Sequence, residues 1–158
     1  MNTSDPNNTL PNRDLSGLKV LIIDDSKSIL RIAEALLAEF NCWVMTASDG
    51  FEALPVIASF KPDVVFVDIM MPRLDGYQTC ALIKANRHYK NIPVIMLSSK
   101  DGLFDLAKGR LAGSDKYLTK PFTREDLLAI LESDVLAEHD LQRQSVQNNA
   151  GAALAEGE

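Results

Sequence analysis

Short apolar runs alternate with segments of helical periodicity along most of the chain. In four of the runs the apolar residues are continuous, which is typical of strands that are buried on both faces of a parallel sheet. Between the runs, apolar residues recur at three- and four-residue spacing, which favours helices with one buried face. The predicted strands span residues 19–23, 42–46, 64–67, 92–97 and 116–118.

Small polar residues at the start of the intervening segments predict where the helices begin, since their side chains can accept a hydrogen bond from the first turn. Pro55 lies inside the second predicted helix and should kink it, because proline lacks a backbone N–H. Five alternating strand–helix units predict an α/β fold, a doubly wound five-stranded parallel sheet with five helices and right-handed crossovers. The expected helix starts are Ser26, Asp49, Asp75, Asp101 and Thr123.

The composition divides the chain into three parts. Residues 1–16 and 138–158 are too polar to bury the area that would offset the entropy of ordering, so we expect a disordered N-terminal segment and a flexible C-terminal tail. Residues 17–137 form the expected folded domain. The tail is acidic, because six acidic residues and one basic residue lie at or after Glu132.

Charge and hydropathy exclude several classes of protein. The net charge of −6 gives no clustered basic surface for nucleic acid. The longest apolar run, residues 127–131, is far shorter than the roughly 20 residues of a membrane span. Two cysteines cannot form a disulfide framework, and the first 16 residues do not form a signal peptide. A cytoplasmic protein with no membrane insertion and no nucleic-acid partner is expected.

Polar side chains end the predicted strands. Ligands of parallel sheets bind at the carboxyl edge, so these groups should converge on one pocket. Three close carboxylates would repel one another, and a divalent cation that prefers oxygen ligands, above all Mg²⁺, removes that penalty. One carboxylate could then attack a phosphorus atom as a nucleophile. The groups are Asp24 and Asp25 after the first strand, Asp68 after the third, Ser98 after the fourth and Lys120 after the fifth.

Each of these residues also has an ordinary structural interpretation. A strand-terminal aspartate often caps a helix or forms a turn, and Ser98 alone would be a simple strand-end hydroxyl. Lys120 alone would be a solvated charge, and Tyr117 a half-buried strand residue. It is their joint placement at successive strand ends that favours a functional site.

Four motifs in residues 19–131 resemble the receiver domain of bacterial two-component response regulators, of which CheY is the minimal example. They are Ile-Ile-Asp24-Asp25-Ser, Phe-Val-Asp68-Ile-Met-Met-Pro-Arg-Leu-Asp-Gly, Val-Ile-Met-Leu-Ser98-Ser and Tyr117-Leu-Thr-Lys120-Pro121-Phe. The resemblance implies a strand order of 2-1-3-4-5.

The resemblance also implies a role for each residue of the pocket. Asp68 matches the phospho-acceptor, and Asp25 and Asp68 would bind Mg²⁺ directly, with Mn²⁺ as a possible substitute. Asp24 would act largely through water, and the backbone carbonyl of Met70 would be a further metal ligand.

Three further matches belong to the conformational switch and phosphate binding. Ser98 matches the switch hydroxyl and Tyr117 the aromatic switch residue, while Lys120 matches the lysine that pairs with a phosphoryl oxygen. The bond before Pro121 is expected to be cis.

The implied function is that of a stand-alone switch and not of a conventional enzyme, although self-phosphorylation from small donors and self-dephosphorylation are expected. A histidine kinase or its phosphotransfer domain would phosphorylate Asp68. The face built by the fourth helix, fifth strand and fifth helix would then bind an effector, as a monomer or as a phosphorylation-dependent dimer. Residues 66–122 most resemble regulators of chemotaxis-like systems that control type IV pili and twitching motility, which implies an effector in the pilus machinery.

Three alternatives remain at this point. The first is a flagellar chemotaxis regulator, and the second is an interaction module that never accepts phosphate. The third, a phosphatase of the haloacid-dehalogenase type, is disfavoured because its nucleophile begins an Asp-x-Asp motif after the first strand, whereas Asp68 follows the third.

Local chemistry adds one hypothesis. Met70 lies two residues after Asp68, and Lys100 two after Ser98, so both should flank the path of hydrolytic water and modulate the lifetime of the phosphoryl group. The alternative is that Met70 merely packs against the loop at Pro72.

Overall fold

The computed structural model describes residues 15–99 and 106–135. Five parallel strands form one sheet in the order β2-β1-β3-β4-β5, which confirms the predicted fold class and strand order. The strands are β1 (Lys19–Ile23), β2 (Trp43–Ala47), β3 (Val64–Asp68), β4 (Val94–Ser99) and β5 (Lys116–Lys120). The helices are α1 (Lys27–Ala38), α2 (Gly50–Phe60), α3 (Gly76–Ala85), α4 (Leu106–Ala112) and α5 (Arg124–Ile130), followed by the π-helical segment η1 (Leu131–Val135).

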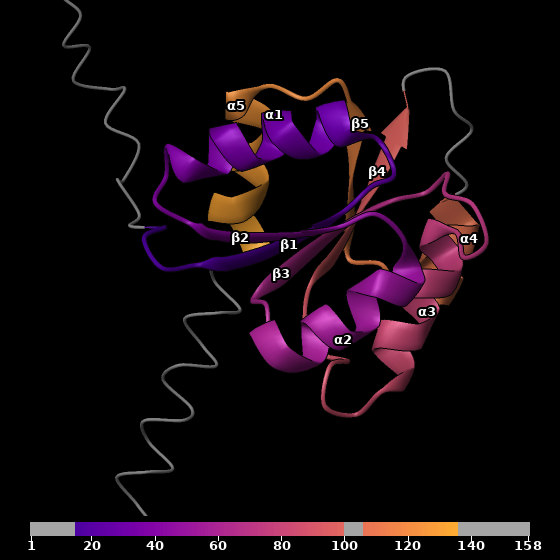
Figure 1. Ribbon diagram of the computed structural model, residues 1–158. Coiled ribbons are helices and arrows are strands. Elements are labelled where there is room, and N and C mark those ends of the chain that lie inside the picture. Colours follow the sequence, from indigo (N-terminus) through magenta and orange to yellow (C-terminus); the bar gives the residue numbers. More distant parts are fainter. Residues whose placement is uncertain (1–14, 100–105, 136–158) are drawn as a thin grey trace, which may run out of the picture.

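Helices cover both faces of the sheet. Figure 1 shows α1 and α5 on one face and α2, α3 and α4 on the other. Alternate residues of the central strands therefore enter two separate cores. Val20, Ile22 and Phe66 pack toward α1 and α5, and Leu21, Ile23 and Val67 belong to the cluster with Ala53 and Ile57 of α2.

The strand β2 differs from its prediction. Its continuous apolar run suggested burial on both faces, but Trp43 is 63% exposed and Met45 is 42% exposed. The reason is topological. With the order 2-1-3-4-5, β2 forms an edge of the sheet, where the covering helix layer ends. The strand also begins one residue later than expected and extends to Ala47.

Four predicted helix starts are confirmed as N-caps, with side chains that accept a hydrogen bond from the first turn: Ser26, Asp49, Asp75 and Thr123. The fourth expected start, Asp101, lies outside the described residues. Helix α2 continues past Pro55 to Phe60. Within the described ranges, no helix combines the length and the apolar character that crossing a membrane requires.

The folded domain begins earlier than expected. The predicted disordered segment extended to residue 16, but Leu15 is buried in the same cluster as Leu18 and Leu131. Its carbonyl oxygen also accepts a weak hydrogen bond from the Cys42 thiol, at 3.7 Å. Leu15, which looked isolated in a polar segment, therefore packs at the end of the hydrophobic core. Residues 1–14 and the tail 138–158 lie outside the described residues.

A close backbone contact joins the end of β3 to the start of α3. The Gly76 N–H donates to the Ile69 carbonyl oxygen at 3.0 Å. A Cβ atom on Gly76 would lie 2.4 Å from the Asp68 carbonyl oxygen and 2.7 Å from the Ile69 Cα. Both neighbours are backbone atoms, so no side-chain movement can relieve the clash. Only glycine therefore permits this packing behind Asp68.

We expect Gly76→Ala to destabilise the fold by about 1–3 kcal/mol or more, because it overpacks rigid backbone. Gly17→Ala is the control. Gly17 has φ +81°, but an added Cβ meets nothing within 4 Å, so its cost should be limited to about 1 kcal/mol of backbone strain. Urea unfolding at equilibrium measures both. Equal losses would contradict the steric argument.

Candidate functional site

Strand ends bring four charged groups together at the carboxyl edge of the sheet. Asp24 and Asp25 directly follow β1, Asp68 is the last residue of β3, and Lys120 is the last residue of β5. The strands β1 and β3 are hydrogen-bonded neighbours, with Ile23 paired to Val67. One carboxylate oxygen from each aspartate lies within 4.8 Å of the others.

The ammonium group of Lys120 binds two of these carboxylates. Its Nζ lies 3.1 Å from Asp24 Oδ2 and 3.2 Å from Asp68 Oδ1. Burial alone would lower the pKa of Lys120, but the attraction of the Asp24 and Asp68 charges outweighs it and raises that pKa above its usual value. Lys120 therefore stays charged and offsets part of the negative charge of the site.

The two carboxylates bound by Lys120 are buried. Asp24 is inaccessible to solvent, and its Oδ1 accepts a 2.9 Å hydrogen bond from the Ser26 N–H. Asp68 is 4% exposed and accepts a longer one, 3.4 Å, from the Met70 N–H. Burial, reinforced by the Asp24 charge, raises the pKa of Asp68 to about 6, against the opposing effect of Lys120. The site thus holds a carboxylate whose charge is incompletely balanced.

Solvent reaches the site from one side. Asp25 is exposed, and it lines a cavity of about 620 Å³ together with Met70, Pro72, Tyr77 and Lys108 among others. The Lys108 ammonium lies over the Tyr77 ring, 5.1 Å from its centroid, and adds a positive charge at the cavity wall. A small anionic ligand could therefore approach beside Asp25.

The proposed switch residues lie on neighbouring strands. Ser98 on β4 is buried, and its Oγ donates to the Ser99 carbonyl oxygen at 3.2 Å. Tyr117 on β5 is 51% exposed, so its ring is turned outward. The Lys120–Pro121 bond, which the sequence led us to expect as cis, is cis. Lys100 lies outside the described residues.

Two features of the site were missed in the sequence. Ser26 was assigned only as a helix cap, yet its backbone N–H also binds the Asp24 carboxylate. The Asp-x-Ser spacing signals such an Asx turn. Lys108 and Tyr77 come from different helices, and no local pattern indicates that they meet at the cavity.

The donor set fits a divalent metal ion. Three carboxylates within reach of one point supply the oxygen ligands that Mg²⁺ prefers, and the exposed Asp25 leaves room for the water molecules that Mg²⁺ retains. Lys120 alone cannot balance three negative charges, so a cation at this point would relieve the remaining repulsion.

We expect Asp68→Asn to stabilise the metal-free protein at pH 7, because it removes a buried charge. The size is about 1–3 kcal/mol, since each unit of pKa shift corresponds to about 1.4 kcal/mol. Below pH 3.8 the parent carboxyl is protonated in both states. Between 3.8 and about 6 only the folded state keeps its proton, so the stability of the parent falls as the pH rises.

The advantage of the variant should therefore grow between about pH 4 and 6 and then level off. Urea unfolding with a chelator present measures it across this range. Glu34→Gln, on an exposed position of α1, controls for the loss of a carboxylate. A constant difference between Asp68→Asn and the parent at every pH would disprove the charge argument.

Comparison with known proteins now identifies the family. The model of the response regulator receiver domain matches residues 20–132. PilG of Pseudomonas aeruginosa PAO1 is 66% identical over 119 residues, which cover 75% of this chain and 88% of PilG. Several other curated relatives are longer proteins, of which the chain spans 42–56%.

Solved structures agree. The chemotaxis protein CheY4 of Vibrio cholerae has a TM-score of 0.70 at 32% identity, with coverage of 74% of this chain and 98% of CheY4. The receiver domain of the sensor histidine kinase PA1611 from P. aeruginosa PAO1, which holds a magnesium ion in its active-site cleft, has a TM-score of 0.69 at 28% identity and covers 76% and 98%. The chain belongs to the response regulator receiver domain family.

Proposed function

We propose that the chain is a phosphorylation-dependent switch that accepts a phosphoryl group on Asp68. The observation that supports this most strongly is the pairing of Asp68 with Lys120 at 3.2 Å beside two further carboxylates. Asp68 Oδ attacks the phosphorus of a phosphohistidine. An O–P bond forms as the N–P bond breaks, and the imidazole nitrogen keeps the electron pair.

Magnesium is the proposed cofactor, with Mn²⁺ as a substitute. Asp25 and Asp68 would bind it directly, Asp24 would act largely through water, and the Met70 carbonyl oxygen would complete the protein ligands. The bound metal would neutralise phosphoryl oxygens. Lys120 would orient the phosphoryl group and pair with one of its oxygens, since its ammonium already lies at the attacking carboxylate.

The new charge would then act on the switch residues. The Ser98 hydroxyl lies on the strand next to β3 and would turn from the Ser99 carbonyl to a phosphoryl oxygen. Tyr117, exposed in this structure, would move inward behind it. A nearly complete shift needs about 5 kcal/mol of differential stabilisation, and charge-assisted hydrogen bonds of about 1.5–3 kcal/mol each could supply much of it.

The affected surface would be that of α4, β5 and α5, where an effector would bind. A histidine kinase or its phosphotransfer domain would be the donor, and the protein would act in the cytoplasm as a monomer or a phosphorylation-dependent dimer. The likeness to PilG supports a role in a chemotaxis-like pathway that controls type IV pili and twitching, with an effector in the pilus machinery.

Incubation with Mg²⁺ and acetyl phosphate should add one phosphoryl group to the protein, detected by intact mass spectrometry. Asp68→Ala and a chelator should each abolish the adduct. Lys120→Gln should sharply slow its formation, because the phosphoryl oxygens lose their cation. Asp63→Asn is the matched control. It removes a carboxylate at the amino-terminal end of β3, opposite the end that carries Asp68, and should behave as the parent. An adduct that survives Asp68→Ala would refute the assignment.

Met70 should prolong the life of the phosphoryl group. Its side chain is 72% exposed and lines the cavity beside Asp25, which supports a role in obstructing water and disfavours burial against the Pro72 loop. Met70→Asn should lose phosphate several-fold faster, as followed by the decay of the adduct. The control is Leu82→Asn, which makes the same kind of change at another exposed apolar residue, on α3. Decay at the parent rate in Met70→Asn would refute this role.

A further inference from the structure

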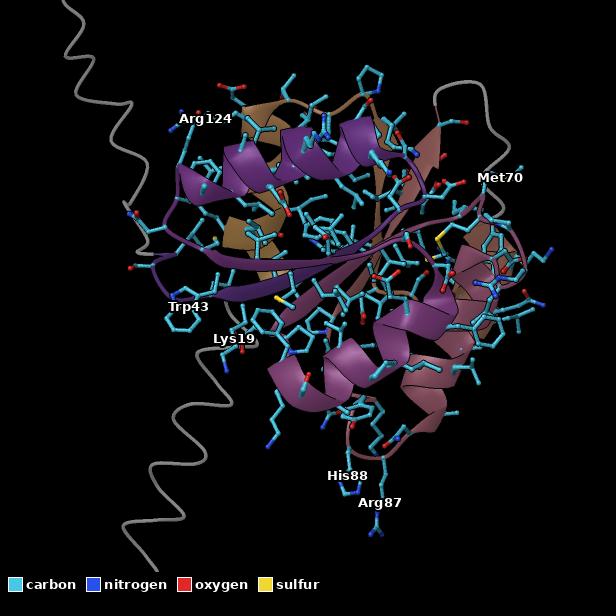
Figure 2. The ribbon with its side chains drawn as sticks, viewed as in Figure 1. Lys19, Trp43, Met70, Arg87, His88 and Arg124 are labelled. Atoms are coloured by element: carbon cyan, nitrogen blue, oxygen red, sulfur yellow. The ribbon has the colours of Figure 1, made fainter. Side chains whose placement is uncertain are left out.

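The cavity beside Asp25 adjoins the proposed phospho-acceptor and carries a cation on its wall. Its lining includes Asp25 after β1, Met70 after β3 and Lys108 of α4. A carboxylate oxygen of Asp25 lies within 4.8 Å of one from Asp68. In Figure 2, Met70 lies at the end of the molecule far from Trp43. The cavity is therefore at the end of the sheet where the phosphoryl group would be transferred.

The ammonium group of Lys108 is positioned by a contact between two helices. It lies 5.1 Å from the centroid of the Tyr77 ring, and Tyr77, in the first turn of α3, lines the same cavity. The negative face of an aromatic ring attracts a cation. Tyr77 is partly buried against the core cluster beneath it, whereas Lys108 is exposed. A ligand in the cavity can therefore reach the ammonium group.

The charges on the cavity wall suit a leaving group with a single negative charge. Among the described residues that line the cavity, Lys108 is the only one with a positive charge, and it shares the wall with the carboxylates of Asp25 and Asp75. Asp25 is a proposed metal ligand. Asp75 Oδ1 accepts a 2.8 Å hydrogen bond from the Gln78 N–H as the cap of α3. Both acids thus have other roles, and they would repel a highly charged anion.

The direction of attack places the leaving group of a donor in this cavity. Attacking and leaving atoms lie roughly in line on opposite sides of phosphorus. Asp68 is buried, and its Oδ1 is bound by Lys120 Nζ and by the Met70 N–H. Solvent reaches the site beside the exposed Asp25. A small donor that enters from this side brings its phosphoryl group toward Asp68 and leaves the rest of the molecule in the cavity.

We propose, on the basis of the proposed function, that Lys108 makes the site selective for acyl phosphates among small phosphoryl donors. An Asp68 oxygen bonds to phosphorus while the bond between phosphorus and the acyl oxygen breaks. The acyl oxygen keeps the electron pair, so the acyl group departs as a carboxylate and no proton moves. Negative charge grows on the acyl oxygen during the reaction, and Lys108 therefore stabilises the transition state more than the bound donor.

Other classes of leaving group fit this wall less well. The nitrogen of phosphoramidate already carries its proton and departs as neutral ammonia, which gains little from a nearby cation. The nucleoside diphosphate released from a nucleoside triphosphate carries several negative charges, and Lys108 alone would have to balance them against Asp75. The apolar side chains of Met70 and Pro72 complete the lining, and a short acyl group can pack against them.

The rate of adduct formation from two donors tests this selectivity. Acetyl phosphate and phosphoramidate are compared at saturating Mg²⁺ by intact mass spectrometry over time, and the ratio of their rate constants is taken for each variant. Lys108→Gln should lower the rate with acetyl phosphate about threefold, the size expected for an exposed ion pair. The rate with phosphoramidate should stay near that of the parent.

Two further variants separate the position of the charge from its presence. Lys108→Arg keeps the charge at the cavity wall and should keep the parent ratio. Arg110→Gln is the matched control, because Arg110 is exposed on the same helix and does not line the cavity. It should also keep the parent ratio. The difference between the parent and Lys108→Gln should fade near 1 M salt, where the Debye length is about 3 Å.

The failure of this inference and the failure of the proposed function give different results. An unchanged ratio in Lys108→Gln, or an equal change in Arg110→Gln, would overturn the role of Lys108 while the adduct on Asp68 still forms. A parent protein that forms no adduct on Asp68 with either donor would overturn the proposed function, and the donor selectivity with it.

Discussion

The arrangement of the site depends on one cation among buried acids. Asp24 and Asp68 sit side by side because β1 and β3 are neighbours, and their charges repel. Lys120 holds them, although β5 lies two strands beyond β3, a span of about 10 Å. Only a long side chain from the carboxyl end of β5 can reach that far. The strand order, the lengths of the strands and this ion pair are therefore mutually dependent.

The incomplete neutralisation of the Asp24 and Asp68 charges by Lys120 also determines how the site would respond to added charge. A carboxylate with a raised pKa beside a fixed ammonium is poorly neutralised, so any change that adds positive charge or redistributes negative charge affects all four groups. A phosphoryl group on Asp68 would draw Lys120 away from Asp24 and increase the demand for a metal ion. The backbone of Gly76 packs closely against that of Asp68 and Ile69, which leaves little room for the backbone behind Asp68 to move. The response would therefore pass to the side chains of β4 and β5. Under the proposed function, this would be the physical basis for transmitting a local charge change to one face.

Local signals made much of this structure predictable. The caps at Asp75 and Thr123 act within three residues, and strand-end polar residues converge in any parallel sheet. The features that could not be predicted depend on strand order and on contacts between residues far apart in the sequence. The run around Trp43 looks like a buried strand, but its exposure follows from a strand order that only the family resemblance supplied. Leu15 looked too isolated to fold, because its partners come from Leu18 and distant Leu131.

The two edges of the sheet face opposite requirements. On the β5 side of the sheet, Tyr117 of β5 and Leu111 of α4 are exposed, which would suit the surface that we propose binds and releases an effector. The β2 edge has comparable apolar exposure but no contact with the phosphoryl site, so binding there would be insensitive to phosphorylation. A second copy seated on β2 would add constant, unregulated association.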